Sequence, residues 1–226
     1  MSIFILNIET ATTNCSVSLS KDGETIVLKE DNAKNYSHAE KLHVYIDEVL
    51  KASLIKASDL SAIAVSKGPG SYTGLRIGVS AAKGLCFALD KPLIAISTLE
   101  ALAHQVACCD GVIVALLDAR RMEVYSAVFD ANYSPIRGTE AQVLDSHSFS
   151  EYLERGPVYF IGDGVEKTKI LIQHPNAIFL EGKLPSANEM GVLAQSKYKI
   201  SDIEDVAYFE PYYLKDFVAL KPKPKL

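Results

Sequence analysis

The residues with the clearest capacity for chemistry lie in the glycine-rich stretch 66–78, SKGPGSYTGLRIG. Glycines, hydroxyl groups and an arginine at one turn are typical of a loop that binds phosphate at the start of a helix. A P-loop has a lysine after its last glycine, but Leu75 follows Gly74 here, which excludes that motif. The dinucleotide motif also fits poorly. The third glycine of this stretch lies one residue further along than in that motif. The strand predicted at 92–97 also ends in serine rather than in an acid.

These glycines can instead have a structural role, in which they shape the loop that leads into the following helix. Gly68 and Gly70 flank a proline, which is typical of a turn, and Ser71 or Thr73 can cap the helix predicted over residues 74–89. Because that helix is apolar around most of its circumference, we expect it to be buried on more than one side. Small residues recur along it at intervals of three and four. This ridge indicates either close packing of another subunit's helix or burial within the same domain.

An amphipathic helix predicted over residues 36–54 precedes the glycine loop, with apolar side chains at helical spacing. The two helices together form the surface that we predict to contact a partner, and two copies of this pair could assemble a four-helix bundle. The predicted interface consists of Leu42, Ile46, Val49, Gly70, Ser71, Thr73, Gly74, Arg76, Gly78 and Ala81.

The elements that position these residues follow the same order twice. Each half begins with three antiparallel strands and continues with helix, strand, helix, strand and helix. Capping boxes, Ser97 with Glu100 and Ser186 with Glu189, are predicted to begin the last helix of each half. The predicted fold is therefore α/β, with two similar domains, residues 1–104 and 105–226, that contain mixed five-stranded sheets flanked by helices. The predicted strands cover residues 3–10, 15–20, 24–30, 60–66, 91–97, 111–119, 121–130, 138–144, 157–161 and 176–181.

This duplicated order resembles the actin-like ATPase (ASKHA) fold of sugar kinases, Hsp70 and actin. The resemblance implies that an acidic hairpin from each half faces a cleft that binds phosphates and metal. Glu9 and Asp118 lie at the two matching turns, although no lysine or arginine in the first hairpin offsets phosphate charge. A nucleotide cleft would include Glu9, Thr10, Asp118, Arg120, Gly162, Asp163 and Gly164. Asp118 and Arg120, with Arg121 and Glu123, are otherwise interpreted as a charged turn or a cluster that faces a partner.

Four ordered motifs resemble the TsaB (YeaZ) family of tRNA threonylcarbamoyladenosine biosynthesis subunits. They are KGPGSYTGLRIG at 67–78, LLDARRMEVYSAVF at 116–129, VYFIGDGVEK at 158–167 and EPYYLK at 210–215. The resemblance implies a scaffold and activator without catalytic activity, which works with the catalytic paralogue TsaD and the ATPase TsaE. Together these proteins attach threonylcarbamoyl to adenosine 37 of tRNAs that read codons beginning with A. A homodimer is expected when the partner is absent, and tRNA binding only through the complex.

Metal ligands are missing where the catalytic paralogue is expected to carry an HxxxH pair, since Thr98 and Leu102 occupy those positions. His38 and His43 are five residues apart and cannot share one ion on a helix. Three further histidines are isolated and are interpreted as surface or structural residues: His104, His147 and His174. We therefore expect no metal and no cofactor.

Composition narrows the class of protein. The net charge of −5 argues against independent binding of nucleic acid, which requires a concentrated basic face. There is no charged-then-apolar leader and no long apolar run, so we expect a cytoplasmic protein. Four cysteines without CxxC spacing are expected to be free thiols, and the lysine- and proline-rich end at 221–226 is expected to be extended and exposed. The alternative function is a small-molecule kinase or ATPase of the actin-like fold. A protease is a third, but no catalytic triad can be assembled.

Overall fold

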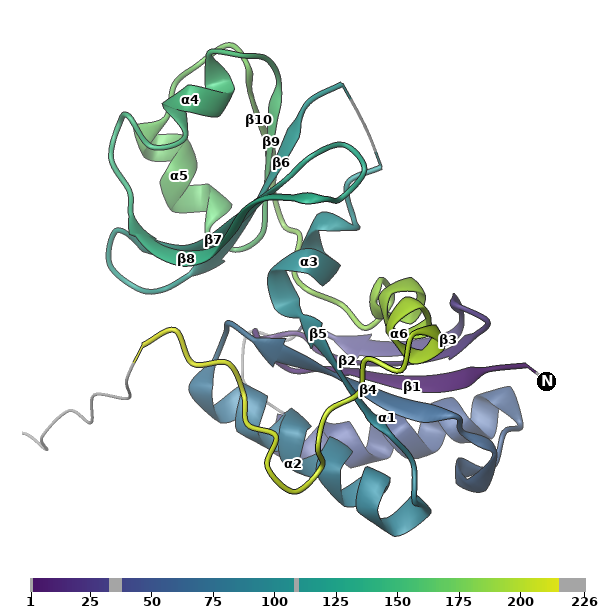
Figure 1. The fold of residues 1–226 in the computed structure, drawn as a ribbon. Coiled ribbons are helices and arrows are strands. Elements are labelled where there is room, and N and C mark those ends of the chain that lie inside the picture. Colours follow the sequence, from purple (N-terminus) through teal and green to yellow (C-terminus); the bar gives the residue numbers. More distant parts are fainter. Residues whose placement is uncertain (1, 33–37, 108–109, 216–226) are drawn as a thin grey trace, which may run out of the picture.

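The computed structural model describes residues 2–32, 38–107 and 110–215, which build two α/β halves around two five-stranded sheets (Figure 1). The lysine- and proline-rich end lies outside the described residues, as do Cys108 and Cys109. Cys15 and Cys86 are free thiols in the core, and burial raises their pKa values to about 11 and about 12. None of the helices in the described ranges has both the length and the apolar character needed to cross a membrane.

The first sheet has the strand order β3-β2-β1-β4-β5. Its strands are β1 (Phe4–Glu9), β2 (Cys15–Lys21), β3 (Glu24–Asp31), β4 (Ala62–Gly68) and β5 (Leu93–Ser97). The first three strands pair antiparallel as predicted, whereas β1, β4 and β5 run parallel because helices connect them. The β2–β3 hairpin closes through Asp22 and Gly23, whose positive φ angles suit a two-residue type I′ turn.

The second sheet repeats this arrangement with the order β10-β9-β6-β7-β8. Its strands are β6 (Val112–Asp118), β7 (Glu123–Phe129), β8 (Pro135–Val143), β9 (Val158–Ile161) and β10 (Ala177–Leu180). Each strand occupies the place of its counterpart in the first sheet, with β6, β9 and β10 parallel and β7 and β8 antiparallel. The duplication predicted from pattern is confirmed, and the fold is the actin-like ATPase fold.

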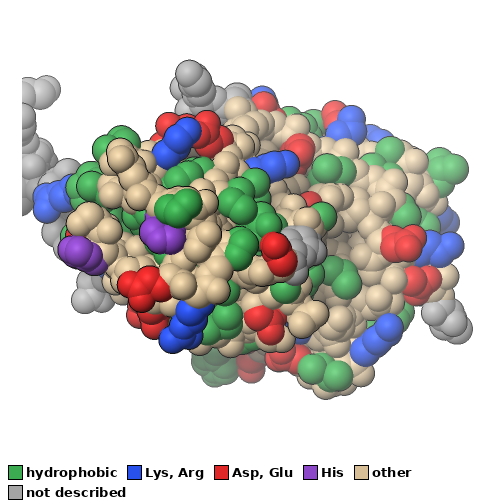
Figure 2. All heavy atoms as spheres, turned by 90° about the horizontal axis from the view of Figure 1, so that it is seen from above, with side chains coloured by type: hydrophobic (Ala, Val, Ile, Leu, Met, Phe, Trp, Pro, Cys, Tyr) green, Lys and Arg blue, Asp and Glu red, His purple; other side chains and the backbone are tan. Residues whose placement is uncertain are grey.

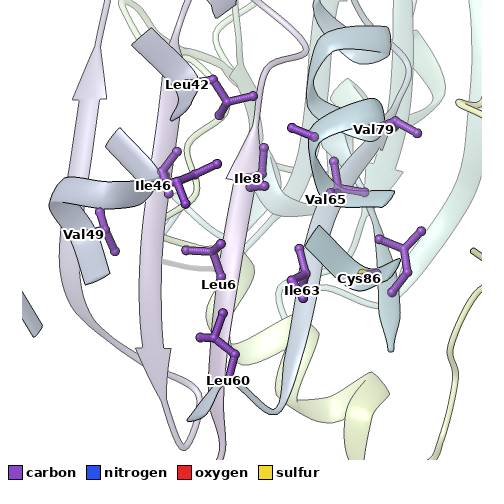
Figure 3. Packing of buried hydrophobic residues seen from close by; sticks show 14 of the residues in the cluster. Leu6, Ile8, Leu42, Ile46, Val49, Leu60, Ile63, Val65, Val79 and Cys86 are labelled. Atoms are coloured by element: carbon purple, nitrogen blue, oxygen red, sulfur yellow. The ribbon is translucent and has the colours of Figure 1, made fainter. Parts of the chain in front are cut away.

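Two long helices, α1 (His38–Ser53) and α2 (Tyr72–Leu89), cover one face of the first sheet. Leu42, Ile46 and Val49 of α1 are buried in the core beneath them. Figure 3 shows this apolar face of α1 turned toward β1, where Leu6 and Ile8 lie. The prediction that these three residues of α1 contact a partner is therefore wrong, because the chain's own sheet already covers them.

The remaining helices cover the other sheet faces. Between the two sheets lies α3 (Thr98–Ala103). Its Leu99 and Leu102 pack against β6, and Ala101 packs with the first sheet. The far face of the second sheet is covered by α4 (Ser150–Leu153) and α5 (Val165–Leu171), and a 3-10 turn, η1 (Ala57–Asp59), precedes β4.

The last helix, α6 (Met190–Lys199), is predicted within the C-terminal domain of residues 105–226 but packs on the first sheet. Its Met190 and Ala194 are buried with residues of β1, β4 and β5. Buried serines on β2 hold the segment before it: Ser18 Oγ donates to the carbonyl of Ala187 at 2.7 Å, and Ser16 Oγ accepts from its N–H at 3.0 Å. The chain therefore returns to the first sheet after β10.

Neither predicted capping box forms. Ser97 is the N-cap of α3, but its side chain makes no capping hydrogen bond. The N-cap of α6 is Glu189, and the hydroxyl of Ser186 donates to Glu30 of β3 at 2.7 Å. Ser186 is thus engaged in the contact between α6 and the first sheet rather than in starting the helix.

Candidate functional site

The carboxyl group of Glu9, at the end of β1 in the first hairpin, is buried inside the first half. Glu9 is fully buried, and its Oε1 accepts hydrogen bonds from the N–H of Ala11 at 2.6 Å and from Ser66 Oγ at 2.8 Å. Its Oε2 has no hydrogen-bond partner among the described residues. Burial raises the pKa of Glu9 to about 7, although the hydrogen bonds from Ala11 and Ser66 oppose that shift. The prediction that Glu9 faces a nucleotide is wrong.

Thr10 explains two glycines of α2. It is buried, and its Oγ1 donates to the carbonyl of Gly74 at 2.8 Å. A Cβ on Gly74 would lie 2.2 Å from the carbonyl oxygen of Thr10, and a Cβ on Gly78 would lie 2.2 Å from its Oγ1. These glycines therefore permit close contact between α2 and the first hairpin. The prediction that they meet another subunit is wrong, as is a role for Thr10 in a nucleotide cleft.

The loop before α2 closes on the same hairpin. A Cβ on Gly70 would lie 2.5 Å from the carbonyl oxygen of Ala11, and the N–H of Ser71 donates to that oxygen at 2.6 Å. Ser71 is also the N-cap of α2, since its Oγ accepts a hydrogen bond from the N–H of Gly74 at 3.3 Å. The glycine-rich stretch thus fastens α2 to the end of β1.

A lysine of α5 fixes the turn of the second hairpin. Asp118 is exposed at the end of β6, and its N–H donates to Asp163 Oδ1 at 2.7 Å. Lys167 Nζ donates to Asp118 Oδ1 and to the carbonyls of Arg121 and Glu123, each at 2.8 Å. Desolvation raises the pKa of Asp163, with the hydrogen bond from Asp118 opposing it. This turn is therefore positioned from beneath by α5 and the residues before it.

A cleft of about 620 Å³ lies between the two halves. Arg120 and Arg121, both in left-handed backbone with φ of 68° and 51°, line it together with Lys215. Gly162 and Gly164 do not line it. They lie against Leu116, whose carbonyl oxygen would be 2.0 Å from a Cβ on Gly162. Of the residues predicted for a nucleotide cleft, only Asp118, Arg120 and Asp163 line this one; the first hairpin contributes Ala11 and Thr12.

A second depression, which we call the groove, lies between α1 and α2 and has a volume of about 760 Å³. Three residues of the predicted interface line it, namely Thr73, Arg76 and Ala81. The guanidinium of Arg76 lies 4.2 Å from the centre of the Tyr72 ring, which is also in the groove wall. The other lining residues are Ala39, His43, Ile77, Ser80, Gly84 and Leu85.

Two residues of this surface were missed from the sequence. Gly84 lines the groove, and a Cβ built on it meets no atom within 4 Å. Phe87 lies one helical turn further along α2 and is 87% exposed. A glycine inside a helix costs about 1 kcal/mol relative to alanine, and contacts within the fold do not require this one. A glycine inside a predicted helix is the feature of the sequence that could have identified Gly84. Gly74 and Gly78 share this feature, but they are explained by their contact with Thr10.

Several known proteins resemble this chain over most of its length. The family model described as "TsaD: tRNA N6-adenosine threonylcarbamoyltransferase" matches residues 32–223. The Escherichia coli (strain K12) protein named "tRNA threonylcarbamoyladenosine biosynthesis protein TsaB" is 31% identical, over 97% of this chain and 98% of its own length. The chain belongs to the TsaB (YeaZ) family. The solved structure of YeaZ from Pseudomonas aeruginosa superposes with a TM-score of 0.80 at 26% identity, over 94% of this chain and all of that one.

This chain also shares part of its sequence with proteins that are named as the transferase. A Staphylococcus epidermidis (strain ATCC 35984) protein named "tRNA N6-adenosine threonylcarbamoyltransferase" is 39% identical over 105 residues, which cover 40% of this chain and 31% of that protein. In this member of the TsaB family, the positions predicted to correspond to a metal-binding pair are both fully buried, Thr98 beside β5 and Leu102 in the core around α3. Within the described ranges, no three His, Cys, Asp or Glu side chains converge as a metal site requires.

Three histidines of this TsaB member, His38, His104 and His174, make contacts within the fold. His38 is buried, and its Nε2 donates to the carbonyl of Thr12 at 2.7 Å; desolvation lowers its pKa. His104 stacks on Tyr133 with ring centres 4.1 Å apart. His174 Nδ1 accepts a hydrogen bond from the N–H of Asn176 at 3.2 Å, and His147 is exposed.

Proposed function

We propose that this chain is the non-catalytic activator subunit of a cytoplasmic complex that attaches threonylcarbamoyl to adenosine 37 of tRNAs reading codons that begin with A. Its groove is the docking site for the catalytic paralogue, TsaD. The observation that carries the proposal is Gly84, a glycine within α2 whose missing side chain leaves open space in the groove. Close approach of a partner's backbone at this point would explain the glycine, because any side chain here would occupy the space that the partner needs.

The chemistry of the groove suits a partner built like this chain. Its lining is mainly apolar, and the exposed Phe87, one helical turn beyond Gly84 on α2, adds further apolar surface. The paralogue shares sequence with this family, which supports an equivalent pair of helices on its surface. Two such pairs can pack as four helices and bury both grooves. When the paralogue is absent, a second copy of this chain takes its place and forms a homodimer.

The rival function, a kinase or ATPase of the same fold, lacks support at the first hairpin. An actin-like ATPase needs an acidic group there that faces the phosphates. Glu9 instead lies beneath Ala11 and Ser66, both of which donate hydrogen bonds to its carboxyl group. The acids that line the cleft, Asp118, Glu123 and Asp163, all come from the second half.

The ATPase TsaE and the tRNA substrate join the proposed complex rather than this chain alone. The net charge of −5 gives the isolated chain little attraction for phosphate. On the face seen in Figure 2, lysine and arginine side chains are scattered among aspartates and glutamates, with no broad basic area. We expect no measurable binding of tRNA by the isolated chain at physiological salt.

Reconstitution of tRNA modification tests the proposed function. Purified TsaD, TsaE, threonylcarbamoyl donor, ATP and tRNA are assayed with and without this chain, and with the Asp118→Asn and Asp163→Asn variants. We expect modification to require the chain and to continue with either variant, because neither carboxyl performs chemistry. Modification at the same rate without the chain, or metal-dependent ATP hydrolysis by the chain alone that the two variants abolish, would reject the proposal.

A further inference from the structure

A segment after α6 links the groove to the cleft; we call residues 204–215 the strap. It leaves the first sheet where the N–H of Glu204 donates to the carbonyl of Leu93 at 2.9 Å. It then runs along α2, as the yellow trace in Figure 1 shows, and Lys83 Nζ donates to the carbonyls of Ala207 and Phe209 at 3.2 and 2.9 Å. The strap is therefore fastened to the flank of α2 along its first part.

The far end of the strap forms part of the cleft. The N–H of Tyr212 donates to the carbonyl of Lys67 at 2.7 Å, just before the glycine-rich loop. Lys215 pairs with Glu123 of β7 and lies 5.8 Å from the centre of the Tyr125 ring. Within the described residues, Lys215 thus connects a segment anchored on the first half to the hairpin of the second half.

Between these two anchors, the strap contacts the rim of the groove. The hydroxyl of Tyr213 accepts a hydrogen bond from Arg76 Nε at 3.1 Å. The rings of Tyr213 and Tyr72 have their centres 5.1 Å apart. Because Arg76 and Tyr72 both line the groove, the strap fixes two side chains of the groove rim.

We propose that the strap couples the cleft to the groove, so that the spacing of the two halves regulates how tightly the partner binds. When the halves are close, the pair between Lys215 and Glu123 keeps Tyr213 against Arg76 and leaves the groove rim ordered. When the halves separate, that pair breaks, the end of the strap loosens, and Arg76 loses a fixed acceptor. Binding then carries the additional entropic cost of ordering the rim. By reciprocity, an occupied groove favours the closed cleft. The regulatory part rests on the proposed function.

The coupling is tested first in the free chain, through exchange of the Arg76 Nε proton measured by NMR. Tyr213→Phe removes the acceptor and is the direct reference. Lys215→Met removes only the remote anchor, and we expect it to raise the exchange rate about fivefold, a typical size for coupling within one protein. Lys169→Met, which breaks the exposed pair with Glu181 outside the strap, is the matched control and leaves the rate unchanged. An unchanged rate in Lys215→Met, with a raised rate in Tyr213→Phe, overturns the coupling.

The second test measures the affinity of the same variants for TsaD. We expect Lys215→Met and Tyr213→Phe each to weaken binding about fivefold. The double variant should lose no more affinity than the single variant with the larger loss, because both substitutions act through one strap. Additive losses overturn the coupling, and so does wild-type affinity in Lys215→Met. If the wild-type chain itself does not bind TsaD, the proposed function fails, while the exchange of the Arg76 proton still decides whether the strap connects cleft and rim.

Discussion

The two faces of α2 carry glycines that look alike in sequence and serve opposite purposes. On the inner face, Gly74 and Gly78 leave room for Thr10, whose atoms would lie 2.2 Å from a side chain at either position. On the outer face, Gly84 opens onto the groove and a Cβ there would touch nothing within 4 Å. The inner glycines are explained by the fold. Contacts among the described residues do not require the outer one, and the proposed docking of a partner gives it a role.

We therefore expect the inner face of α2 to contribute to stability and its outer face to contribute to partner binding. The inner face belongs to the contact that seals Glu9 and Thr10 beneath the glycine-rich loop. The outer face shows an apolar surface that ends at the exposed Phe87. Substitutions on the inner face should therefore change folding, and substitutions on the outer face should change binding while the chain stays folded.

The largest expected effect comes from a long charged side chain on the inner face. Gly78→Arg places a guanidinium against Thr10 in the core, where it clashes and lacks a partner. Such a buried, unpaired charge costs about 3–5 kcal/mol before the clash is added, which is comparable with the total stability of many domains. We expect Gly78→Arg to be unfolded or insoluble by circular dichroism, with Gly84→Arg folded. A stable, cooperatively folded Gly78→Arg variant would remove the distinction between the two faces.

A smaller expected effect is the pH dependence of stability that comes from Glu9, the acid buried beneath the inner face of α2. The pKa of Glu9 is about 7 in the folded chain against an ordinary value of 4.5, so the folded state keeps a proton that the unfolded chain has lost. The stabilisation from this protonation is full below about pH 4.5 and is lost as the pH rises to about 7, a difference of about 3 kcal/mol.

Glu9→Gln removes that titration while keeping an oxygen that can accept from Ala11 and Ser66. Urea unfolding at pH 5 and pH 8 should show the variant gaining stability relative to the wild type at the higher pH, by about 2–3 kcal/mol. Asp118→Asn, at an exposed carboxyl, is the control and should not change the relative stability in this way. Equal pH dependence in Glu9→Gln and wild type would mean that Glu9 is not sealed.

The smallest effect compares the same substitution on both faces. Gly84→Ala enters open space and should stabilise the chain by about 0.5–1 kcal/mol through helix propensity. Gly74→Ala meets the carbonyl oxygen of Thr10 and should destabilise it by about 1–3 kcal/mol. Thermal unfolding of both variants gives the two signs, and the same sign in both would contradict the assignment of faces.

Much of the fold follows from pattern in the sequence. The three antiparallel strands that begin each half and the repeated order of elements led to two mixed sheets, because both features depend on neighbours in sequence. The course of the chain after β10 does not follow in this way. The buried serines Ser16 and Ser18 bind the backbone before α6, and no local rule connects residues so far apart in sequence.

The sequence indicates the two helices that form the candidate groove, but it does not indicate which of their residues face it. Helical spacing identifies Leu42, Ile46 and Val49 as one face of α1, but periodicity does not say whether that face meets a sheet or a partner. Glu9 was placed correctly at a turn, while the direction of its side chain depends on Ser66, a residue of another strand. Gly84 could be distinguished from Gly78 only when the position of Thr10 was known.

The central claim, that the outer face of α2 binds the catalytic paralogue, is tested most directly by the affinity of Gly84→Arg for TsaD. Isothermal titration of the purified proteins is compared with wild type and with Gly138→Arg, a matched substitution at another glycine with open space, on β8 of the second half. The claim predicts that Gly84→Arg folds normally and binds at least about 100-fold more weakly, because a long charged side chain must be desolvated in the groove, and that Gly138→Arg binds like the wild type. A folded Gly84→Arg variant with wild-type affinity for TsaD would contradict the claim.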